Sequence, residues 1–295
     1  MSSVLRVSQT TTIRGAGSHL RWTGVGKSAA LYLGMSLVAL LMVVPFYWMV
    51  MTSFTPPAAA FTYPPRWYPL TVTLANYARM VEVMPFARFY LNSTFITCSV
   101  VVGQLVICSL AGFSFARLHF PFRSQAFALV LGSMMIPHIV NIIPLYVMYR
   151  SIGWINTFYP LIIPAIFTGS FGTFLMRQYF MTIPVEVEDA ARIDGASTIT
   201  IFLRIMMPLA RPSLAALSIF TFLSTWNDFF SPLIFINSKS KMTITLGIAA
   251  LHGEFSSEWT VMMAAATASV IPILAVYVIG QKHFIQGIAL TGLKG

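Results

Sequence analysis

Six stretches of the chain are long and apolar enough to cross a lipid bilayer as helices. They are residues 28–51, 89–116, 125–149, 155–176, 212–236 and 259–281. A membrane-spanning helix needs about 20 mostly apolar residues, because its backbone polar groups must be satisfied inside the helix. Of the 295 residues, 57% are hydrophobic and only 9% are charged, too few polar groups to cover a soluble protein of this size. The sequence therefore predicts an all-α, polytopic membrane protein with six transmembrane helices.

The basic residues indicate how such a bundle is oriented. Six helices place both termini on one side of the membrane. If that side is the cytoplasm, the inner segments hold twelve of the 18 Lys and Arg residues and the outer segments hold six, as the positive-inside rule favours. The net charge of +10 is thus explained by topology. No nucleic-acid partner is expected, because the basic residues lie between apolar runs and form no basic face.

The predicted domain organisation is simple. Residues 1–27 are polar and rich in Ser, Thr and Gly, and predict a loose cytoplasmic N-terminal tail. Residues 28–283 form the six-helix transmembrane domain. Residues 284–295 form a short cytoplasmic C-terminal tail that contains Gly287, Gly292 and Gly295.

The chain carries no pattern that predicts catalysis. Gly26-Lys27-Ser28 has the end of a phosphate-binding loop, but Arg21 stands where that motif needs Gly, and no strand precedes it. The five His residues are scattered without metal-ligand spacing. We therefore expect no catalytic residue, no metal and no cofactor bound by this chain. A membrane enzyme would need a constellation of side chains that the sequence does not offer.

Residues 184–212 form a long polar segment between two apolar runs, on the predicted cytoplasmic side. Pro184 suits the first turn of a short helix, and the acids that follow favour its positive end. Gly195 can end that helix in the left-handed conformation, and a second helix is expected from Ser197. Pro208 and Pro212 then break or kink the entry to the fifth span. The segment predicts a docking surface for a soluble partner. The alternative, an amphipathic helix lying on lipid, is disfavoured by its acids and its small apolar face.

The same segment resembles the coupling loop, or EAA motif, of permease subunits in bacterial ABC importers. That motif reads Glu-Ala-Ala, three residues, Gly, nine residues, Ile, any residue, Leu-Pro. Asp189 stands where the family usually has Glu, and Met207 where it has Leu; the matching positions are Asp189-Ala190-Ala191, Gly195, Ile205 and Pro208.

Further matches point to the carbohydrate branch of that family, which includes the maltose-type second permease and the glycerol-3-phosphate permease. They cover roughly residues 90–295. They are Ile136-Pro137, Ile143-Pro144-Leu145-Tyr146, Gly153 to Thr157, Phe171 to Gln178, Trp226-Asn227-Asp228-Phe229, Pro232-Leu233 and Gly287 to Gly295.

The resemblance implies a type I ABC importer permease fold in the plasma (inner) membrane of a bacterium. The implied partners are a homologous second permease, two ABC ATPase subunits that hold ATP and Mg, an extracytoplasmic solute-binding protein and membrane lipid. The implied cargo is an oligosaccharide, a disaccharide or a sugar-like solute, with glycerol-3-phosphate or a phosphodiester derivative as the alternative. The C-terminal tail either inserts between the ATPases or lies on lipid. The residues expected to couple to the ATPases are Glu186, Glu188, Asp189, Ala190, Ala191, Asp194 and Gly195.

One ionisable side chain falls inside a predicted span. Asp228 lies beside Trp226, Asn227 and Phe229, and charges within membranes usually face a bundle interior or an aqueous cavity. Aromatic rings and amides suit a sugar, so these four residues form a candidate substrate pathway. The alternative is structural, with Asp228 capping or cross-linking helices. A self-contained secondary transporter would need several coupling-ion carboxylates in its spans, and Asp228 alone is available.

Overall fold

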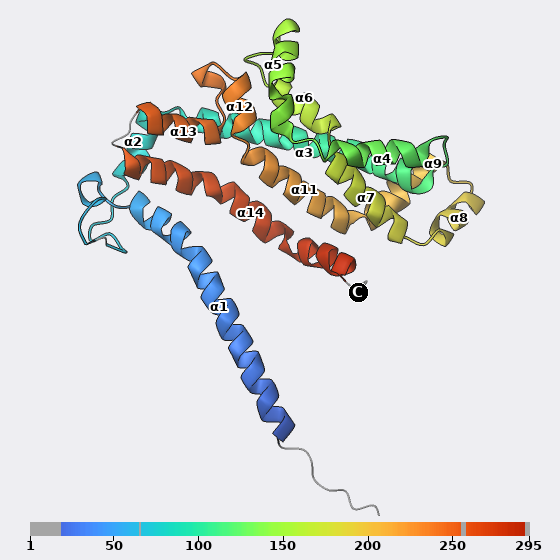
Figure 1. The fold of residues 1–295 in the computed structure, drawn as a ribbon, viewed down its shortest axis with the longest axis horizontal. Coiled ribbons are helices and arrows are strands. Elements are labelled where there is room, and N and C mark those ends of the chain that lie inside the picture. The colour runs from blue at the N-terminus through green and yellow to red at the C-terminus, as the bar shows by residue number, and fades with distance from the viewer. Residues whose placement is uncertain (1–18, 65, 255–257, 293–295) are drawn as a thin grey trace, which may run out of the picture. The chain divides into compact units, whose positions relative to one another are not determined.

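Every regular element in the described part of the chain is a helix (Figure 1). The computed structural model describes residues 19–64, 66–254 and 258–292. The predicted all-α class is confirmed for these residues. The α-helices are α1 (His19–Ser53), α2 (Ala75–Val83), α3 (Phe86–Arg117), α4 (Arg123–Ser133), α5 (Ile142–Ser151), α6 (Tyr159–Phe167), α7 (Ser170–Thr182), α8 (Glu186–Ile193), α9 (Thr198–Ile201), α10 (Met207–Leu209), α11 (Arg211–Trp226), α12 (Phe230–Phe235), α13 (Ile244–Glu254) and α14 (Trp259–Gly292); 3-10 turns occupy η1 (Pro57–Ala59), η2 (His138–Asn141) and η4 (Lys239–Lys241), and a π-helical turn occupies η3 (Phe202–Met206).

Four of the described segments are long and apolar enough to cross a membrane. They are Lys27–Ser53, Phe86–Arg117, Tyr159–Thr182 and Trp259–Gln281. A fifth candidate is the bent pair Thr198–Leu209 and Arg211–Trp226. Four of the six predicted spans therefore correspond to such segments, and a fifth overlaps the bent pair.

The predicted span 125–149 is two short helices with a break between them. Helix α4 has 11 residues and α5 has 10, each about half of what a span requires. Pro137 lies in the break. Proline cannot donate a backbone hydrogen bond, and it disfavours helical backbone at the residue before it. The apolar run alone did not reveal that break.

Other boundaries also differ from the predicted ones. Helix α11 ends at Trp226, and after three residues the short helix α12 follows. Helix α14 continues past residue 281 to Gly292, and α1 begins at His19, within the predicted tail 1–27. Residues 1–18 and 293–295 lie outside the described residues, so most of the predicted N-terminal tail and the end of the C-terminal tail are not described.

The chain divides into two compact units, residues 1–49 and 50–295. In the first, the described residues belong to α1. In the second, α3 is the central helix: it packs against α6, α7 and α11, and α11 packs against α14. Helix α2 lies against the start of α14, where the buried Asn76 accepts a hydrogen bond from Thr260 Oγ1 at 3.0 Å.

Helices α3 and α7 approach each other very closely. A Cβ atom at Gly112 would lie 2.7 Å from Met176 Cβ and 2.8 Å from the Arg177 backbone nitrogen. One turn earlier on α3, the buried Cys108 thiol donates to the Gly169 carbonyl oxygen at 3.2 Å. Small residues that allow such an approach are typical of helix packing in membranes. The contact brings the C-terminal ends of α3 and α7 side by side.

An apolar cluster at these ends fixes the segment that follows α7. Phe113 of α3 contacts Phe180 of α7 edge-to-face, with ring centroids 5.9 Å apart, and the Phe202 ring centroid lies 5.1 Å from that of Phe113. Met206 and Ala210 of the later segment are fully buried in the same cluster. Residues 184–212 are therefore packed on the membrane helices and do not form a free loop.

Candidate functional site

Helix α8 begins the polar segment as the sequence predicts. It starts two residues after Pro184, and Glu186, Glu188 and Asp189 occupy its first turn. The first four backbone N–H groups of a helix lack partners inside it and give that end a partial positive charge. The three carboxylates stabilise this end of α8.

A left-handed glycine ends α8, also as predicted. Gly195 has a φ of +82°, and its N–H donates to the Arg192 carbonyl oxygen at 3.0 Å. The Ala196 N–H donates to the Ala191 carbonyl oxygen at 2.9 Å, which completes a Schellman motif. Ser197 Oγ then accepts a hydrogen bond from the Thr200 N–H at 3.3 Å and caps α9.

The segment then widens into a π-helical turn and bends sharply. Within η3, the Met207 N–H bonds to the Phe202 carbonyl oxygen, five residues back. Pro208 lacks a donor and crowds the preceding turn, which accounts for the wider turn. The helix axis changes direction by 76° between Thr198–Leu209 and Arg211–Trp226. The predicted break between Pro208 and Pro212 is confirmed.

Helix α8 has a buried face and an exposed face. Glu188 and Ala191 are buried at 2% and 8% exposure. The exposed face contains Glu186, Asp189, Ala190 and Ile193, which stand at helical spacings of three and four residues. Ile193 is 87% exposed, and Asp194 and Gly195 at the helix end are exposed as well. An acidic rim beside a small apolar patch is a surface suited to a protein partner.

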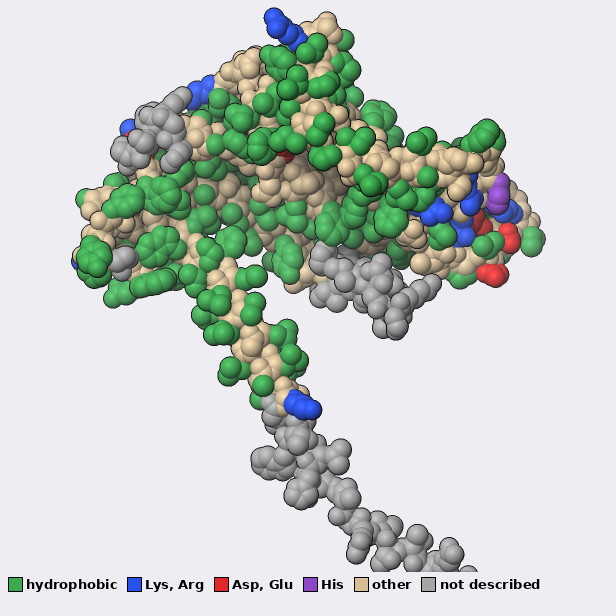
Figure 2. Space-filling model, viewed as in Figure 1, with side chains coloured by type: hydrophobic (Ala, Val, Ile, Leu, Met, Phe, Trp, Pro, Cys, Tyr) green, Lys and Arg blue, Asp and Glu red, His purple; other side chains and the backbone are tan. Residues whose placement is uncertain are grey.

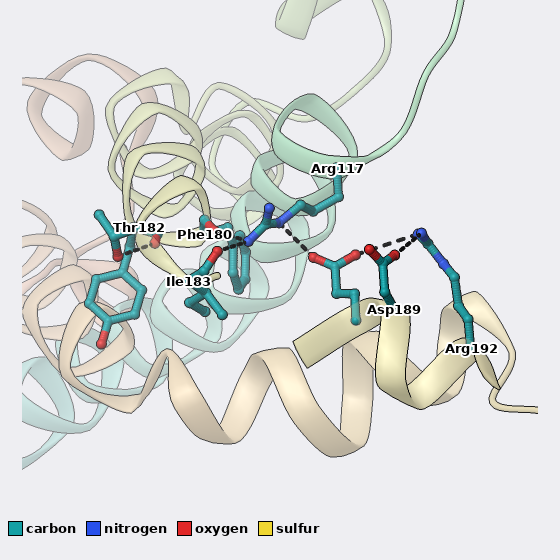
Figure 3. A network of polar contacts seen from close by, with 8 residues as sticks. Arg117, Phe180, Thr182, Ile183, Asp189 and Arg192 are labelled. Atoms are coloured by element: carbon teal, nitrogen blue, oxygen red, sulfur yellow. Dashed lines mark hydrogen bonds and ion pairs between the residues drawn. The ribbon is translucent and has the colours of Figure 1, made fainter. Parts of the chain in front are cut away.

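The buried face is held by an arginine from α3. Arg117 Nε lies 2.6 Å from Glu188 Oε1, with 8% and 3% of the two side chains exposed. The contact is an ion pair without directed hydrogen-bond geometry at these two atoms. Arg117 Nη2 donates to the carbonyl oxygens of Phe180, at 2.7 Å, and Ile183. Figure 3 shows Arg117 between these carbonyl groups and α8.

Two weaker ion pairs lie on α8 itself. Arg192 Nη2 is 3.5 Å from Glu188 Oε2, and Arg192 Nη1 is 3.3 Å from Asp189 Oδ1 (Figure 3). The Arg192 side chain is 50% exposed. The pair between Arg192 and Asp189 is exposed on both sides, and pairs of this kind contribute little, about 0.3–0.5 kcal/mol at helical spacing.

Glu188 is thus placed differently from the other predicted coupling residues. The sequence predicts it on a docking surface with Glu186 and Asp189, whereas its carboxylate faces α3. In the sequence, Arg117 is one of the twelve basic residues predicted to lie on the cytoplasmic side, and nothing local to it indicates Glu188 as a partner. The sequence did contain an indication that Glu188 faces inward, because Glu188 and Ala191 stand three residues apart and share the less polar face of α8.

The second predicted site lies where α11 ends. Trp226 is 2% exposed and its indole N–H donates to the Ser269 carbonyl oxygen at 3.1 Å. Its ring stacks on Phe222, with centroids 5.5 Å apart, and contacts Tyr90 edge-on at 5.4 Å. This indole holds α11 against α14 and α3.

Asn227, Asp228 and Phe229 connect α11 to α12. Asn227 is exposed, and its amide donates to the Leu223 carbonyl oxygen at 2.8 Å. Asp228 is half-buried, and its Oδ1 accepts from the Ser231 N–H at 3.2 Å. These contacts are those of helix caps, so the structural interpretation of Asp228 has direct support, and its role in a pathway stays a prediction.

We expect Asp228→Asn to assemble at wild-type yield, because the amide oxygen can accept the same hydrogen bond. Asp228→Ala removes the acceptor and should lower the free energy of unfolding by about 1 kcal/mol. Thermal denaturation and solute uptake would be measured on the same membrane preparation. Altered uptake by a fully assembled Asp228→Asn variant indicates that the charge acts in the pathway, and wild-type uptake removes Asp228 from the site.

Two polar networks were not anticipated from the sequence. Asn156, at a φ of +59°, accepts hydrogen bonds from the Asn237 and Ser238 backbone and receives the Lys241 ammonium on its carbonyl oxygen at 2.6 Å. Asn tolerates the left-handed conformation better than other side chains. The loops 152–158 and 236–241 are joined in this way, and Gln104 similarly bonds to α6 and α11.

Charged side chains are unevenly distributed. Within residues 50–295, Figure 2 shows a group of Lys, Arg, Asp and Glu side chains over the part that holds α8, while hydrophobic side chains cover much of the rest of the face in view. Within the described residues, no group of three His, Cys, Asp or Glu side chains is arranged to hold a metal ion.

Several known proteins are similar in sequence to most of this chain. The family model described as binding-protein-dependent transport system inner membrane component matches residues 108–290. The arabinooligosaccharides transport system permease protein AraQ of Halalkalibacterium halodurans is 32% identical over 90% of this chain and 96% of its own length. The trehalose/maltose transport system permease protein MalG of Thermococcus litoralis is 31% identical over 91% and 98%. The sn-glycerol-3-phosphate transport system permease protein UgpE of Shigella flexneri is 34% identical over 69% and 73%.

A solved structure shares the fold. It is a chain of a bacterial ABC transporter involved in the import of the acidic polysaccharide alginate. It superposes with a TM-score of 0.74 at 25% sequence identity, covering 92% of this chain and 99% of that chain.

Proposed function

This chain belongs to the family of inner membrane components of binding-protein-dependent transport systems, and we propose that it is the permease subunit of an ATP-driven sugar importer. It spans the membrane several times and provides a path for the solute. ATP and Mg are bound by partner ATPases, which carry out the hydrolysis. The observation that carries this proposal is α8: an acidic surface helix held against the membrane helices.

The exposed face of α8 is the proposed coupling surface. Glu186, Asp189, Ala190 and Ile193 face outward on it, and a groove in an ATPase subunit would accept the apolar patch while its basic residues meet the acids. Asp194 and Gly195 complete this surface at the end of the helix. The proposal places α8 in the cytoplasm, with both chain termini on the same side.

The other proposed partners are a homologous second permease and an extracytoplasmic solute-binding protein. Exposed apolar residues cover α4, α5 and the break between them, among them Leu129 at 76%, Met135 at 84% and Ile143 at 75%. Continuous apolar surface of this kind needs lipid or a second membrane subunit to cover it. The binding protein would deliver solute at the opposite end from α8.

We propose an oligosaccharide or disaccharide as the solute, with glycerol-3-phosphate or a phosphodiester derivative as the alternative. AraQ and MalG are named for sugars and align with nine-tenths of this chain. UgpE is named for glycerol-3-phosphate and aligns with a smaller share of it. The longer alignments favour a sugar.

Reconstitution tests this function. The tagged chain would be co-expressed with the ATPase, second permease and binding protein from its own genome, then purified and placed in liposomes. We expect the ATPase to co-purify, and maltose or arabinotriose to enter only with binding protein and ATP. Uptake of glycerol-3-phosphate instead would change the solute class. Uptake by this chain alone, without ATPase, would show a self-contained secondary transporter.

We expect Gly195→Asp to reduce import at least about tenfold while membrane insertion stays normal. No atom lies within 4 Å of a Cβ built at Gly195, so the chain itself can hold the side chain at the strain of a left-handed residue, about 1–2 kcal/mol. The lost import would come from the added bulk and charge at the docking surface. Uptake and membrane content are measured together.

Gly195→Asn is the matched control for this variant. It adds the same volume without a charge and tolerates the left-handed conformation. We expect it to retain part of the import. Unchanged import by Gly195→Asp at normal expression would remove Gly195 from the coupling surface.

A further inference from the structure

We propose that Arg117 is a positioning residue for coupling, because it fixes α8 to the ends of α3 and α7 so that the three helices move together. The inference rests on the proposed function, in which a partner ATPase acts on α8. It concerns the buried face of α8, opposite the docking surface.

One guanidinium holds groups from three parts of the chain. Arg117 is the last residue of α3. Its Nη2 donates to two carbonyl oxygens at the end of α7, those of Phe180 and Ile183, and its Nε faces Glu188 Oε1 of α8. The last four carbonyl groups of a helix have no partner within it. Arg117 satisfies part of the α7 end while its charge pairs with α8.

The covalent chain alone does not provide this link. Helix α7 leads into α8 through residues 183–185, so these two are joined directly, whereas α3 ends 71 positions before Glu188 in sequence (188 minus 117). Among the ion pairs of the described residues, the one between Arg117 and Glu188 joins α8 to another helix; the two formed by Arg192 lie within α8.

Apolar packing at this place cannot fix the orientation of α8 by itself. Ala191 packs into the cluster around Phe113 and Phe180, but apolar contacts are non-directional and permit small rotations. The two hydrogen bonds from Arg117 Nη2 to the α7 carbonyl oxygens are directional and fix the guanidinium, and its ion pair with the Glu188 carboxylate holds α8 at short range in a buried site. A tilt of α8 would separate a buried carboxylate from its partner, so α3 is drawn along with it.

The double variant Arg117→Met/Glu188→Met tests this role. It removes both buried charges and keeps unbranched side chains, so that no unpaired charge remains. We expect near wild-type complex yield and ATPase co-purification. The amount of solute imported per ATP hydrolysed should fall about tenfold, as expected when a coupling contact of typical size is lost. Arg192→Met, which removes the two ion pairs within α8 and keeps the one between Arg117 and Glu188, is the control and should keep the wild-type ratio.

Hydrogen–deuterium exchange gives a second readout that is independent of the solute. In the wild-type complex, ATP should change the protection of α8 and also of the last turns of α3 and α7. In the double variant, the change should persist in α8 and be lost from the last turn of α3. A purely structural role would leave this pattern unaltered once the variant has folded.

The two measurements on the double variant distinguish a positioning role of Arg117 from a purely structural one. Wild-type coupling and a wild-type exchange pattern in the double variant overturn the positioning role. If the double variant does not assemble, Arg117→Lys serves instead, because its ammonium keeps the charge but has no planar fork to hold all three groups; an unchanged import ratio in that variant overturns the role. A wild-type chain that brings down no ATPase refutes the proposed function itself, and with it the inference.

Discussion

Glu188→Lys is expected to remove nearly all folded protein from the membrane, whereas Asp189→Lys leaves the fold intact. The Glu188 side chain is 3% exposed beside Arg117, so the variant would bury two positive charges together. Breaking a buried pair by losing one partner costs about 3–5 kcal/mol, and adding a like charge costs more. This is a large fraction of the typical stability of a domain, about 5–15 kcal/mol.

The neighbouring residue provides the matched comparison. The Asp189 side chain is 57% exposed, so its reversal changes the docking surface and leaves the core unchanged. We expect Asp189→Lys to keep its thermal stability and to lose ATPase co-purification. Both variants would be measured by fluorescence-detected size exclusion and by pull-down. A stable, monodisperse Glu188→Lys protein would contradict the buried pair.

Gly112→Leu should be equally damaging, for a steric reason. Its Cβ would lie 2.7 Å from Met176 Cβ and 2.8 Å from the Arg177 backbone nitrogen. The latter contact is with backbone, which cannot move aside as a flexible side chain does. Overpacking a close-packed site costs about 1–3 kcal/mol and sometimes more. Here α3 and α7 would have to separate, so we expect a severe loss of folded protein, measured as monodisperse yield in detergent.

Gly132→Ala provides the control for that substitution. Gly132 also lies in a helix, α4, but no atom lies within 4 Å of its built Cβ. Replacing a helical Gly with Ala at an open site is neutral or stabilises by about 1 kcal/mol. A Gly112→Leu variant that folds as well as Gly132→Ala would show that α3 and α7 are not in close contact.

Local features of the polar segment were predictable from residue type. Pro184 and the following acids indicate a helix start, Gly195 indicates its left-handed end, and Pro208 with Pro212 indicates a bend. All three appear in the structure. Each depends on backbone restrictions that act within a few residues, so the surrounding fold does not change them.

Long-range partners were not predictable in the same way. Arg117 and Glu188 stand 71 positions apart, and nothing local to Arg117 distinguishes it from an arginine that marks the cytoplasmic end of a span. Residues 125–149 were likewise predicted as one span, because apolar content carries no information on the backbone restriction at Pro137. Tertiary packing decides which acid faces inward and which apolar run is broken.

The buried arrangement of Arg117 and Glu188 also limits how this sequence can drift during evolution. Replacing either residue alone leaves the other charge uncompensated, so single changes pass through a poorly folded intermediate. Replacing both at once avoids that intermediate. We therefore expect these two positions to covary among related sequences, either kept as an Arg and Glu pair or exchanged together. The residue at position 189, on the exposed face, should instead vary with the surface of the partner protein that it contacts.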